Sequence, residues 1–370
     1  MESKKKRLDF LDVAKFIGIF LMVYAHARER GSEIMYIVSF HMPLFFVISG
    51  MTFKVREGES AGDFLVRKIK TYIIPFLILA IMITFCDMGF DGANGVTINW
   101  EYFVGKMVYI YQNTRPFPLW FVLALFFSHI WLYLMIRLSF KRDYLVAIYS
   151  LVVLGMMIVF YRFTPQRLVH SMDASLVGVF FLTTGYLFFR PWNSRVREWI
   201  LSSRLKSFLV GGVLFAIAMV AVFLVDKYID PRKMFDMWGN TYQPEYLRFP
   251  TAVVGSFGVI ILSNVIANPV MGYLGRHTLV VLAFQQDVTI RWFKNYIAAD
   301  WYNSITPFKD GVWSNVLFTF VCTLFSLGFL IPISIILMET HISYIFCKKP
   351  AKWYLNLIDK IKNLSHKEIA

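Results

Sequence analysis

Residues 8–26 read LDFLDVAKFIGIFLMVYAH, and residues 39–50 read SFHMPLFFVISG. Both stretches are apolar enough for a membrane span, yet the first contains a lysine and a histidine and the second contains a histidine. Ionisable side chains within a bilayer are energetically expensive, so they usually line a functional cavity or a proton pathway. These two stretches therefore predict a membrane protein with chemistry inside the bilayer.

The rest of the chain has the composition of a multi-pass membrane protein. It is 57% hydrophobic and only 17% charged, whereas about 25% of the residues of a soluble domain are charged. Apolar runs long enough to cross the hydrocarbon core recur along it. The predicted fold class is all-α, with about ten transmembrane helices at 10–27, 34–53, 69–87, 117–136, 144–160, 174–189, 206–225, 250–266, 272–290 and 313–338.

The net charge of +14 indicates topology rather than a nucleic-acid partner. Lysine and arginine are more frequent in the alternate segments that include the N-terminus, and such segments usually face the cytoplasm. We therefore expect a cell-membrane protein with both termini in the cytoplasm, which requires an even number of spans. Nucleic-acid binding is not expected.

Two regions are expected, a transmembrane domain over 1–340 and a C-terminal segment over 341–370. In the second, Trp353, Leu357 and Ile361 recur at helical spacing among lysines. This pattern is typical of a basic amphipathic helix lying on the cytoplasmic membrane surface. The three cysteines are far apart, so they predict neither a metal site nor a disulfide framework.

Helix geometry relates the ionisable residues of the first two spans. Lys15 and His26 are eleven positions apart, so they fall within roughly 20° of one helix face and about 16 Å apart along the axis. Asp12 lies one turn before Lys15 and could pair with it. His41, in the second span, is expected at a depth close to that of His26. Histidine exchanges a proton near neutral pH, so His26 and His41 are candidates for acid–base catalysis.

The predicted outer loops at 88–116, 226–249 and 291–312 mix acidic, basic and aromatic residues. Such side chains suit sugar recognition, because rings stack on sugar faces while polar groups bind hydroxyls. Aromatic residues also collect at membrane boundaries as anchors, and this reading stays open.

Several motifs together resemble acyltransferase family 3, a family of integral membrane acyltransferases, and in particular its fucose 4-O-acetylase-like branch. The resemblance extends over nearly the whole chain. The motifs are residues 7–15 with His26, the stretch 40–50, and the stretches 118–126, 180–186 and 274–284.

The resemblance implies an acyl-CoA-dependent O-acetyltransferase-like enzyme of polysaccharide modification in the cell envelope. An acyl group would pass from cytoplasmic acyl-CoA, a co-substrate rather than a bound cofactor, to a hydroxyl of an extracytoplasmic sugar or polysaccharide. Acetyl is favoured by resemblance alone, and succinyl or another small group stays open. The basic-x10-His motif of the family maps onto Lys15 and His26, with lysine where arginine is common. Lysine lacks the bidentate fork of arginine.

The remaining assignments follow from this resemblance. His26 would be the general base with His41 assisting, and Lys15 with Asp12 would bind acyl-CoA. Arg115, Trp120 and Gln285 are candidate oxyanion or acceptor contacts. At Gln285 relatives often have a histidine, so this chain lacks a titratable group there.

Two other classes of protein fit part of the pattern. Intramembrane Asp, Lys and His residues also suit a proton-coupled transporter or exporter of a small molecule. A membrane sensing or binding domain is the third reading. Consumption of a thioester separates the enzyme from both, because neither alternative releases CoA.

Overall fold

The computed structural model describes residues 9–28, 31–113, 118–140, 142–164, 167–230, 234–305 and 312–368. Regular structure within these ranges is helical, apart from an isolated bridge between Asp236 and Thr241. The α-helices are α1 (Asp9–Ala27), α2 (Ser32–Val38), α3 (His41–Met51), α4 (Ala61–Lys68), α5 (Ile74–Ala93), α6 (Trp100–Gln112), α7 (Trp120–Leu138), α8 (Asp143–Phe163), α9 (Met172–Phe188), α10 (Ser194–Leu201), α11 (Arg204–Leu224), α12 (Glu245–Ser263), α13 (Pro269–Leu274), α14 (Thr278–Phe284), α15 (Ala299–Ile305), α16 (Val312–Glu339) and α17 (Lys352–Glu368).

Nine helical segments of the described chain are long and apolar enough to cross a membrane. They match nine of the ten expected spans. The tenth, expected at 272–290, is different: α13 ends, residues 275–277 are not helical, and α14 then continues in π-helical turns as far as Ile297. Charged residues in those turns lower the hydropathy of this segment below that of the other nine.

The second expected span is also divided. Its two halves, α2 and α3, meet at Ser39 and Phe40, and His41 is the first residue of α3. A residue at a helix break lies beside backbone groups that have no intrahelical partner. The break therefore gives His41 a polar environment that the interior of a continuous helix would not offer.

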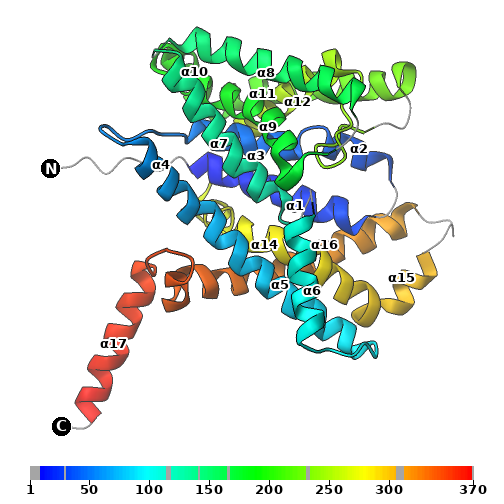
Figure 1. The fold of residues 1–370 in the computed structure, drawn as a ribbon, viewed down its shortest axis with the longest axis vertical. Helices are drawn as coiled ribbons and strands as arrows, with labels where there is room; N and C mark the ends of the chain where they lie inside the picture. The colour runs from blue at the N-terminus through cyan, green and yellow to red at the C-terminus, as the bar shows by residue number, and fades with distance from the viewer. Residues whose placement is uncertain are drawn as a thin grey trace.

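The helices form layers, with α1, α3 and α9 near the middle of the bundle and α8 and α11 toward one side (Figure 1). Most residues of the spans that contain α1, α3 and α9 are buried, whereas only 22% of those in the spans of α8 and α11 are. Exposed apolar helix surface of this extent suits contact with lipid. Asp12 of α1 and His41 of α3, which are both buried, therefore belong to the protein interior.

Two glycines allow α3 and α9 to pack backbone to backbone. A Cβ atom added to Gly50 would lie 1.9 Å from the carbonyl oxygen of Leu182, and one added to Gly185 would lie 2.0 Å from that of Val47. Small residues at such contacts are typical of membrane helices, whose association depends on close van der Waals packing. This contact fixes α3, and with it His41, against the centre of the bundle.

The C-terminal helix α17 extends away from the bundle (Figure 1). The side chains of Trp353, Leu357 and Ile361 on it are exposed. The expected helix is therefore present. Its contact with a membrane surface stays a prediction.

Candidate functional site

α1 borders two cavities with one stripe of side chains. Asp12, Lys15 and Ile19 line a cavity of about 340 Å³, here called the lysine cavity. Met22 and His26 line a second one of about 310 Å³, here called the histidine cavity. These residues are three or four positions apart, so they share one helix face. The prediction that Lys15 and His26 lie on the same face is confirmed.

The lysine cavity is positively charged. Lys15 Nζ donates to Asp12 Oδ1 at 3.0 Å, which is the pairing that their spacing predicts. Arg276 Nε lies 3.8 Å from the other carboxylate oxygen of Asp12, and Lys348 also lines the cavity. Among the described lining residues, three cations thus face a single carboxylate. This balance suits an anionic group such as a phosphate.

The break at 275–277 brings Arg276 to the lysine cavity. A Cβ atom at Gly275 would lie 1.7 Å from the carbonyl oxygen of Asp12. Only glycine permits the chain to come so close to the backbone of α1. The sequence motif at 274–284 contains Arg276, but no role for this residue was predicted.

The histidine cavity brings together four of the predicted site residues: His26, His41, Trp120 and Gln285. Asp236 and Gln286 add polar groups, and the other lining side chains are apolar or aromatic. Two histidines at one cavity wall, in a largely apolar setting, can exchange protons with a bound hydroxyl.

His26 contacts Gln285 directly. The distance between His26 Nδ1 and Gln285 Nε2 is 2.6 Å. Gln285 is fully buried, and its Oε1 atom has no hydrogen-bond partner in the described part of the chain. Gln285 was predicted as an oxyanion or acceptor contact, and the structure places its carboxamide on the proposed base.

The tautomer of His41 is set by the break between α2 and α3. His41 Nδ1 lies 3.0 Å from the carbonyl oxygen of Ile37. A carbonyl oxygen only accepts, so Nδ1 carries the hydrogen and Nε2 of the neutral ring keeps its lone pair. His41 is therefore held with Nε2 as a hydrogen-bond acceptor.

The lysine and histidine cavities meet at a shared wall. Phe121 and Leu282 line both of them. These side chains come from α7 and α14 and share both cavities with the stripe of α1. A flexible molecule that extends from one cavity to the other would pass between them.

A hairpin from the loop at 226–249 forms one side of the histidine cavity. Residues 234–238 line it, and the bridge between Asp236 and Thr241 closes the turn. Asn240 Nδ2 donates to Asp173 Oδ2 at 2.8 Å, which attaches the hairpin to α9. Of the three loops with sugar-binding composition, this is the one whose described residues line the cavity.

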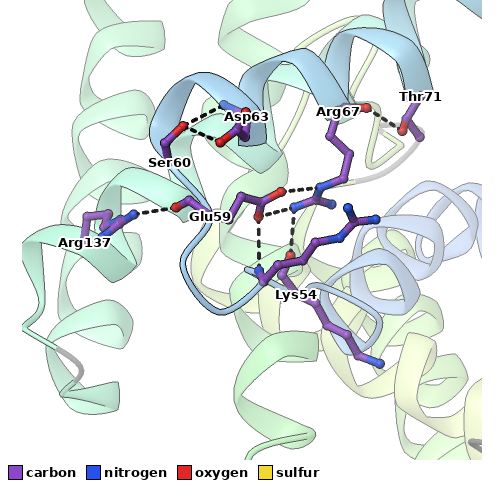
Figure 2. Close-up of polar contacts among 8 residues, drawn as sticks. Lys54, Glu59, Ser60, Asp63, Arg67, Thr71 and Arg137 are labelled. Atoms are coloured by element: carbon purple, nitrogen blue, oxygen red, sulfur yellow. Dashed lines mark hydrogen bonds and ion pairs between the residues drawn. The ribbon is translucent and has the colours of Figure 1, made fainter.

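A third cavity of about 620 Å³, here called the loop pocket, lies at the 52–60 loop and the start of α4. Figure 2 shows how arginines hold that loop: Arg67 donates to both carboxylate oxygens of Glu59, and Arg137 donates to the Glu59 carbonyl. The hydrogen bonds from Arg67 lower the pKa of Glu59 to about 2. Glu59 is thus ionised and already engaged.

The loop pocket adjoins the lysine cavity, and Thr71 and Lys348 line both. Its described lining also includes Arg56 and Lys70, whose charged ends have no ion-pair partner among the described residues, and the carboxylates of Glu57 and Asp63, which have none there either. With Lys348, the unpaired cations of this open volume outnumber its unpaired carboxylates among the described residues, and this balance favours an anionic ligand.

Sequence reasoning missed a third intramembrane histidine, His129 on α7. Its Nδ1 lies 2.7 Å from the carbonyl oxygen of Leu125, and its Nε2 lies 3.1 Å from Ser49 Oγ and 3.3 Å from Tyr72 Oη. Both hydroxyl residues line the lysine cavity. An ionisable residue in an apolar run was the signal that identified His26, and the same signal was present here.

Of the predicted site residues, Arg115 lies outside the described residues. Trp120 begins α7, is buried, and lines the histidine cavity. The other six predicted site residues all line the lysine cavity or the histidine cavity. Five of them belong to α1, α3 and α7. The sixth, Gln285, comes from the π-helical turns after α14.

The apolar helices, the buried polar stripe and the cavities along it define a multi-pass membrane protein with an internal site. Comparison with models of protein families matches the acyltransferase domain of acyltransferase family 3 over residues 8–335. The chain belongs to this family of membrane acyltransferases. Searches of curated proteins and of solved structures find no significant match.

Proposed function

We propose that this protein is an O-acyltransferase that moves an acyl group from cytoplasmic acyl-CoA to a hydroxyl of an extracytoplasmic sugar or polysaccharide. The observation that carries the proposal is the series of three cavities. The loop pocket, the lysine cavity and the histidine cavity are joined by shared lining residues. Arg56 and Lys70 line the cavity at one end of this series, and His26 and His41 line the cavity at the other end.

The first two cavities suit the donor. Acyl-CoA has phosphate groups at one end, a long flexible arm, and a thioester at the other end. Arg56, Lys70 and Lys348 would bind the phosphates at the loop pocket, and Lys15 with Arg276 would bind along the lysine cavity. Lys15 and His26 are about 16 Å apart along α1, so an extended arm would carry the thioester past Phe121 to the histidines.

His26 would act as the general base in the reaction. It takes the proton from the acceptor hydroxyl, and the acceptor oxygen forms a bond to the thioester carbonyl carbon. The carbon–sulfur bond then breaks, and the CoA thiolate takes the proton back from the imidazolium of His26. The products are an ester and the CoA thiol. His41, with its Nε2 lone pair on the same cavity, would assist in moving the proton.

The wall of the histidine cavity favours a carbohydrate acceptor. Trp120 and Trp238 supply flat rings, and Asp236 supplies a carboxylate that accepts hydrogen bonds from hydroxyls. Trp120 is also the described candidate for a donor to the oxyanion, through its indole N–H. Acetyl as the acyl group, the fucose 4-O-acetylase-like branch and a role in the cell envelope rest on the sequence resemblance.

The topology that this function requires has both termini in the cytoplasm of a cell-membrane protein. The continuous helical segment from Thr278 to Ile297 would supply the tenth crossing, which makes the number of spans even. The basic residues of the loop pocket would then lie on the cytoplasmic side, as the positive-inside rule predicts. In this arrangement α17 would lie on the cytoplasmic membrane surface.

Release of CoA by purified protein in lipid vesicles tests the proposal. Acetyl-CoA is added with and without a sugar acceptor, and wild type is compared with His26→Ala. We expect His26→Ala to lower CoA release by about 10²–10⁴-fold, the usual worth of a general base. The matched control is His341→Ala, a histidine at the surface and outside the three cavities.

Each outcome has a clear meaning. Loss of CoA release in His26→Ala alone supports both the reaction and the base. Wild type that releases no CoA with several acyl-CoAs and acceptors would reject the enzyme in favour of a carrier. Unchanged release in folded His26→Ala would retain the enzyme and reject this base.

A further inference from the structure

The lysine cavity has a second wall that differs from its cationic one. Four hydroxyl residues from α3 and from the π-helical turn between α4 and α5 form this wall, here called the hydroxyl wall: Ser49, Thr52, Thr71 and Tyr72. A fifth hydroxyl residue of the cavity, Thr278, belongs to α14 and is not part of the wall. The hydroxyl wall carries no charge, so the phosphate-binding role of the cations does not extend to it.

The two threonines of the hydroxyl wall already donate their hydrogens to helix carbonyls. Thr52 Oγ1 donates to the carbonyl oxygens of Ile48 and Ser49, each at 3.2 Å. Thr71 Oγ1 donates to the Arg67 carbonyl at 2.8 Å, as Figure 2 shows. A hydroxyl has one hydrogen and two acceptor lone pairs. Thr52 and Thr71 therefore offer only lone pairs to a molecule in the cavity.

His129 engages the other two hydroxyls. Its Nδ1 lies 2.7 Å from the carbonyl oxygen of Leu125, which only accepts, so Nδ1 carries the hydrogen of the neutral ring and Nε2 is an acceptor. Ser49 Oγ and Tyr72 Oη lie 3.1 Å and 3.3 Å from Nε2, and the two hydroxyls also bond to each other. In either order, one hydrogen goes to Nε2 and the other goes to the neighbouring hydroxyl. Ser49 and Tyr72 thus also face the cavity as acceptors.

The surroundings of His129 favour its neutral form. The rings of Phe53 and Tyr72 contact its imidazole, and the ammonium of Lys68 lies 5.3 Å and 5.6 Å from the centres of those two rings. Arg67 also acts on His129 electrostatically, and it too is a cation. Nearby positive charge opposes a charged imidazole. A neutral ring keeps Nε2 as an acceptor, so the hydroxyl hydrogens stay engaged there.

A wall made of acceptors limits what can bind to it. Phosphate and carboxylate oxygens are acceptors too, so they suit the cations of the cavity and not the hydroxyl wall. Amide N–H groups are donors and match it. The arm of acyl-CoA has two secondary amides between its phosphates and its thioester. Ser49 lies eight positions after His41, about 12 Å along α3, so an arm bound at the wall can extend to the histidines.

We propose that the hydroxyl wall is a subsite that accepts hydrogen bonds from the amide N–H groups of the acyl-CoA arm, and that His129 is a positioning residue that orients Ser49 and Tyr72 for this contact. The proposal rests on the proposed function for the identity of the ligand. It divides the lysine cavity by chemistry. The cations bind the anionic part of the donor, and the hydroxyl wall sets how far the thioester extends toward His26.

Binding of two ligands to protein in phospholipid vesicles tests the subsite without turnover. The ligands are CoA and a CoA analogue in which ester oxygens replace the two amide N–H groups. Wild type should bind the analogue roughly 2–10-fold more weakly for each hydrogen bond lost. Tyr72→Phe and Ser49→Ala should weaken CoA binding by a similar factor and reduce the difference between the two ligands. Tyr109→Phe and Ser304→Ala, at exposed positions outside the three cavities, are the matched controls and should behave as wild type.

Two substitutions of His129 test its positioning role. His129→Leu removes the acceptor from the Nε2 position, whereas His129→Gln supplies a carboxamide oxygen near it. We expect His129→Leu to weaken CoA binding and to lose the preference for CoA over the analogue, and His129→Gln to restore most of both. Adenosine 3′,5′-bisphosphate, which is the nucleotide end of CoA without the arm, should bind equally to all variants. That result separates a lost subsite from a misfolded protein.

The outcomes distinguish the subsite from the proposed enzyme. Equal binding of CoA and the analogue to wild type would overturn the subsite, as would folded variants that keep the full difference between the ligands. A protein that binds CoA with this dependence on N–H groups but releases none from acyl-CoA would reject the proposed enzyme and retain the subsite. Normal CoA release without the dependence would do the reverse.

Discussion

Lys15 and His26 lie on the same face of α1 but border different cavities, and the wall between those cavities is shared by Phe121 and Leu282. One helix thus places a lysine and a histidine about half a bilayer apart. The separation suits a donor whose charged end and reactive end are far from each other. Under the proposed function, the donor's charged end would bind at Lys15 and the reaction would take place at His26.

The first prediction concerns Lys15. If it binds a phosphate of acyl-CoA, Lys15→Ala should raise KM for acyl-CoA about tenfold or more, because a charge-assisted hydrogen bond contributes about 1.5–3 kcal/mol. The value of kcat should stay near that of wild type. Steady-state kinetics in vesicles measure both constants. Lys352→Ala, at the exposed start of α17, is the control. A fall in kcat with KM unchanged would contradict a binding role.

The second prediction concerns the shared wall. Leu282→Trp should obstruct the passage between the two cavities. We expect acyl transfer to fall by more than tenfold, while acyl-CoA still binds at the loop pocket and lysine cavity. Equilibrium binding of acyl-CoA and CoA release, measured on the same folded preparation, separate these effects. Normal transfer in this variant would show that the donor reaches His26 by another route.

The third prediction concerns the break after α13. Gly275→Ala places a Cβ atom where the carbonyl oxygen of Asp12 lies, so the backbone must shift. Overpacking of this kind costs about 1–3 kcal/mol and occasionally more. We expect a clear fall in the thermal unfolding temperature. Gly155→Ala and Gly328→Ala are matched controls, since a Cβ at either position meets no atom within 4 Å. Equal behaviour of all three variants would reject the close approach as the reason for glycine.

The fourth prediction concerns pH and the 52–60 loop. Arg67 lowers the pKa of Glu59 from 4.5 to about 2. A lowered carboxyl pKa stabilises the fold fully above the unfolded value, and this contribution is lost as pH falls from 4.5 toward 2. Glu59→Gln should therefore be less stable than wild type at neutral pH, by roughly 1 kcal/mol for a pair near the surface.

The difference between Glu59→Gln and wild type should shrink below about pH 4.5, when both are unfolded at a series of pH values. Glu57→Gln serves as control, because the exposed Glu57 forms no ion pair with Arg67 or with any other of the described residues. A difference that grows as pH falls would have the wrong sign for this ion pair.

The stripe on α1 could be predicted because helix geometry is local. The spacing of Asp12, Lys15 and His26 fixes their common face whatever surrounds the helix. The nine long apolar helices were predictable for a similar reason, since span length depends on bilayer thickness rather than on neighbours. The sequence motifs predicted acyltransferase family 3, and the match to the family model over residues 8–335 confirms that prediction.

The break at 275–277 was not predictable in the same way. The apolar run at 272–290 has the length of a continuous span, and only the close approach of Gly275 to α1 explains the interruption. The division of the second span before His41 was missed as well. Pro43 was a local signal for this second break, because proline has no N–H to donate to the carbonyl of Ser39. The break at 275–277 depends on contact with a distant segment, which hydropathy does not report.

The sequence by itself determined a helical membrane protein with a polar stripe in its first span, because periodicity and apolar length act within one segment. Only the tertiary structure decided that Arg276 and Lys348 join Lys15, that Gln285 contacts His26, and that the three cavities adjoin one another. These residues are separated by hundreds of positions along the chain. Their meeting depends on helix packing, which a linear pattern of residues does not specify.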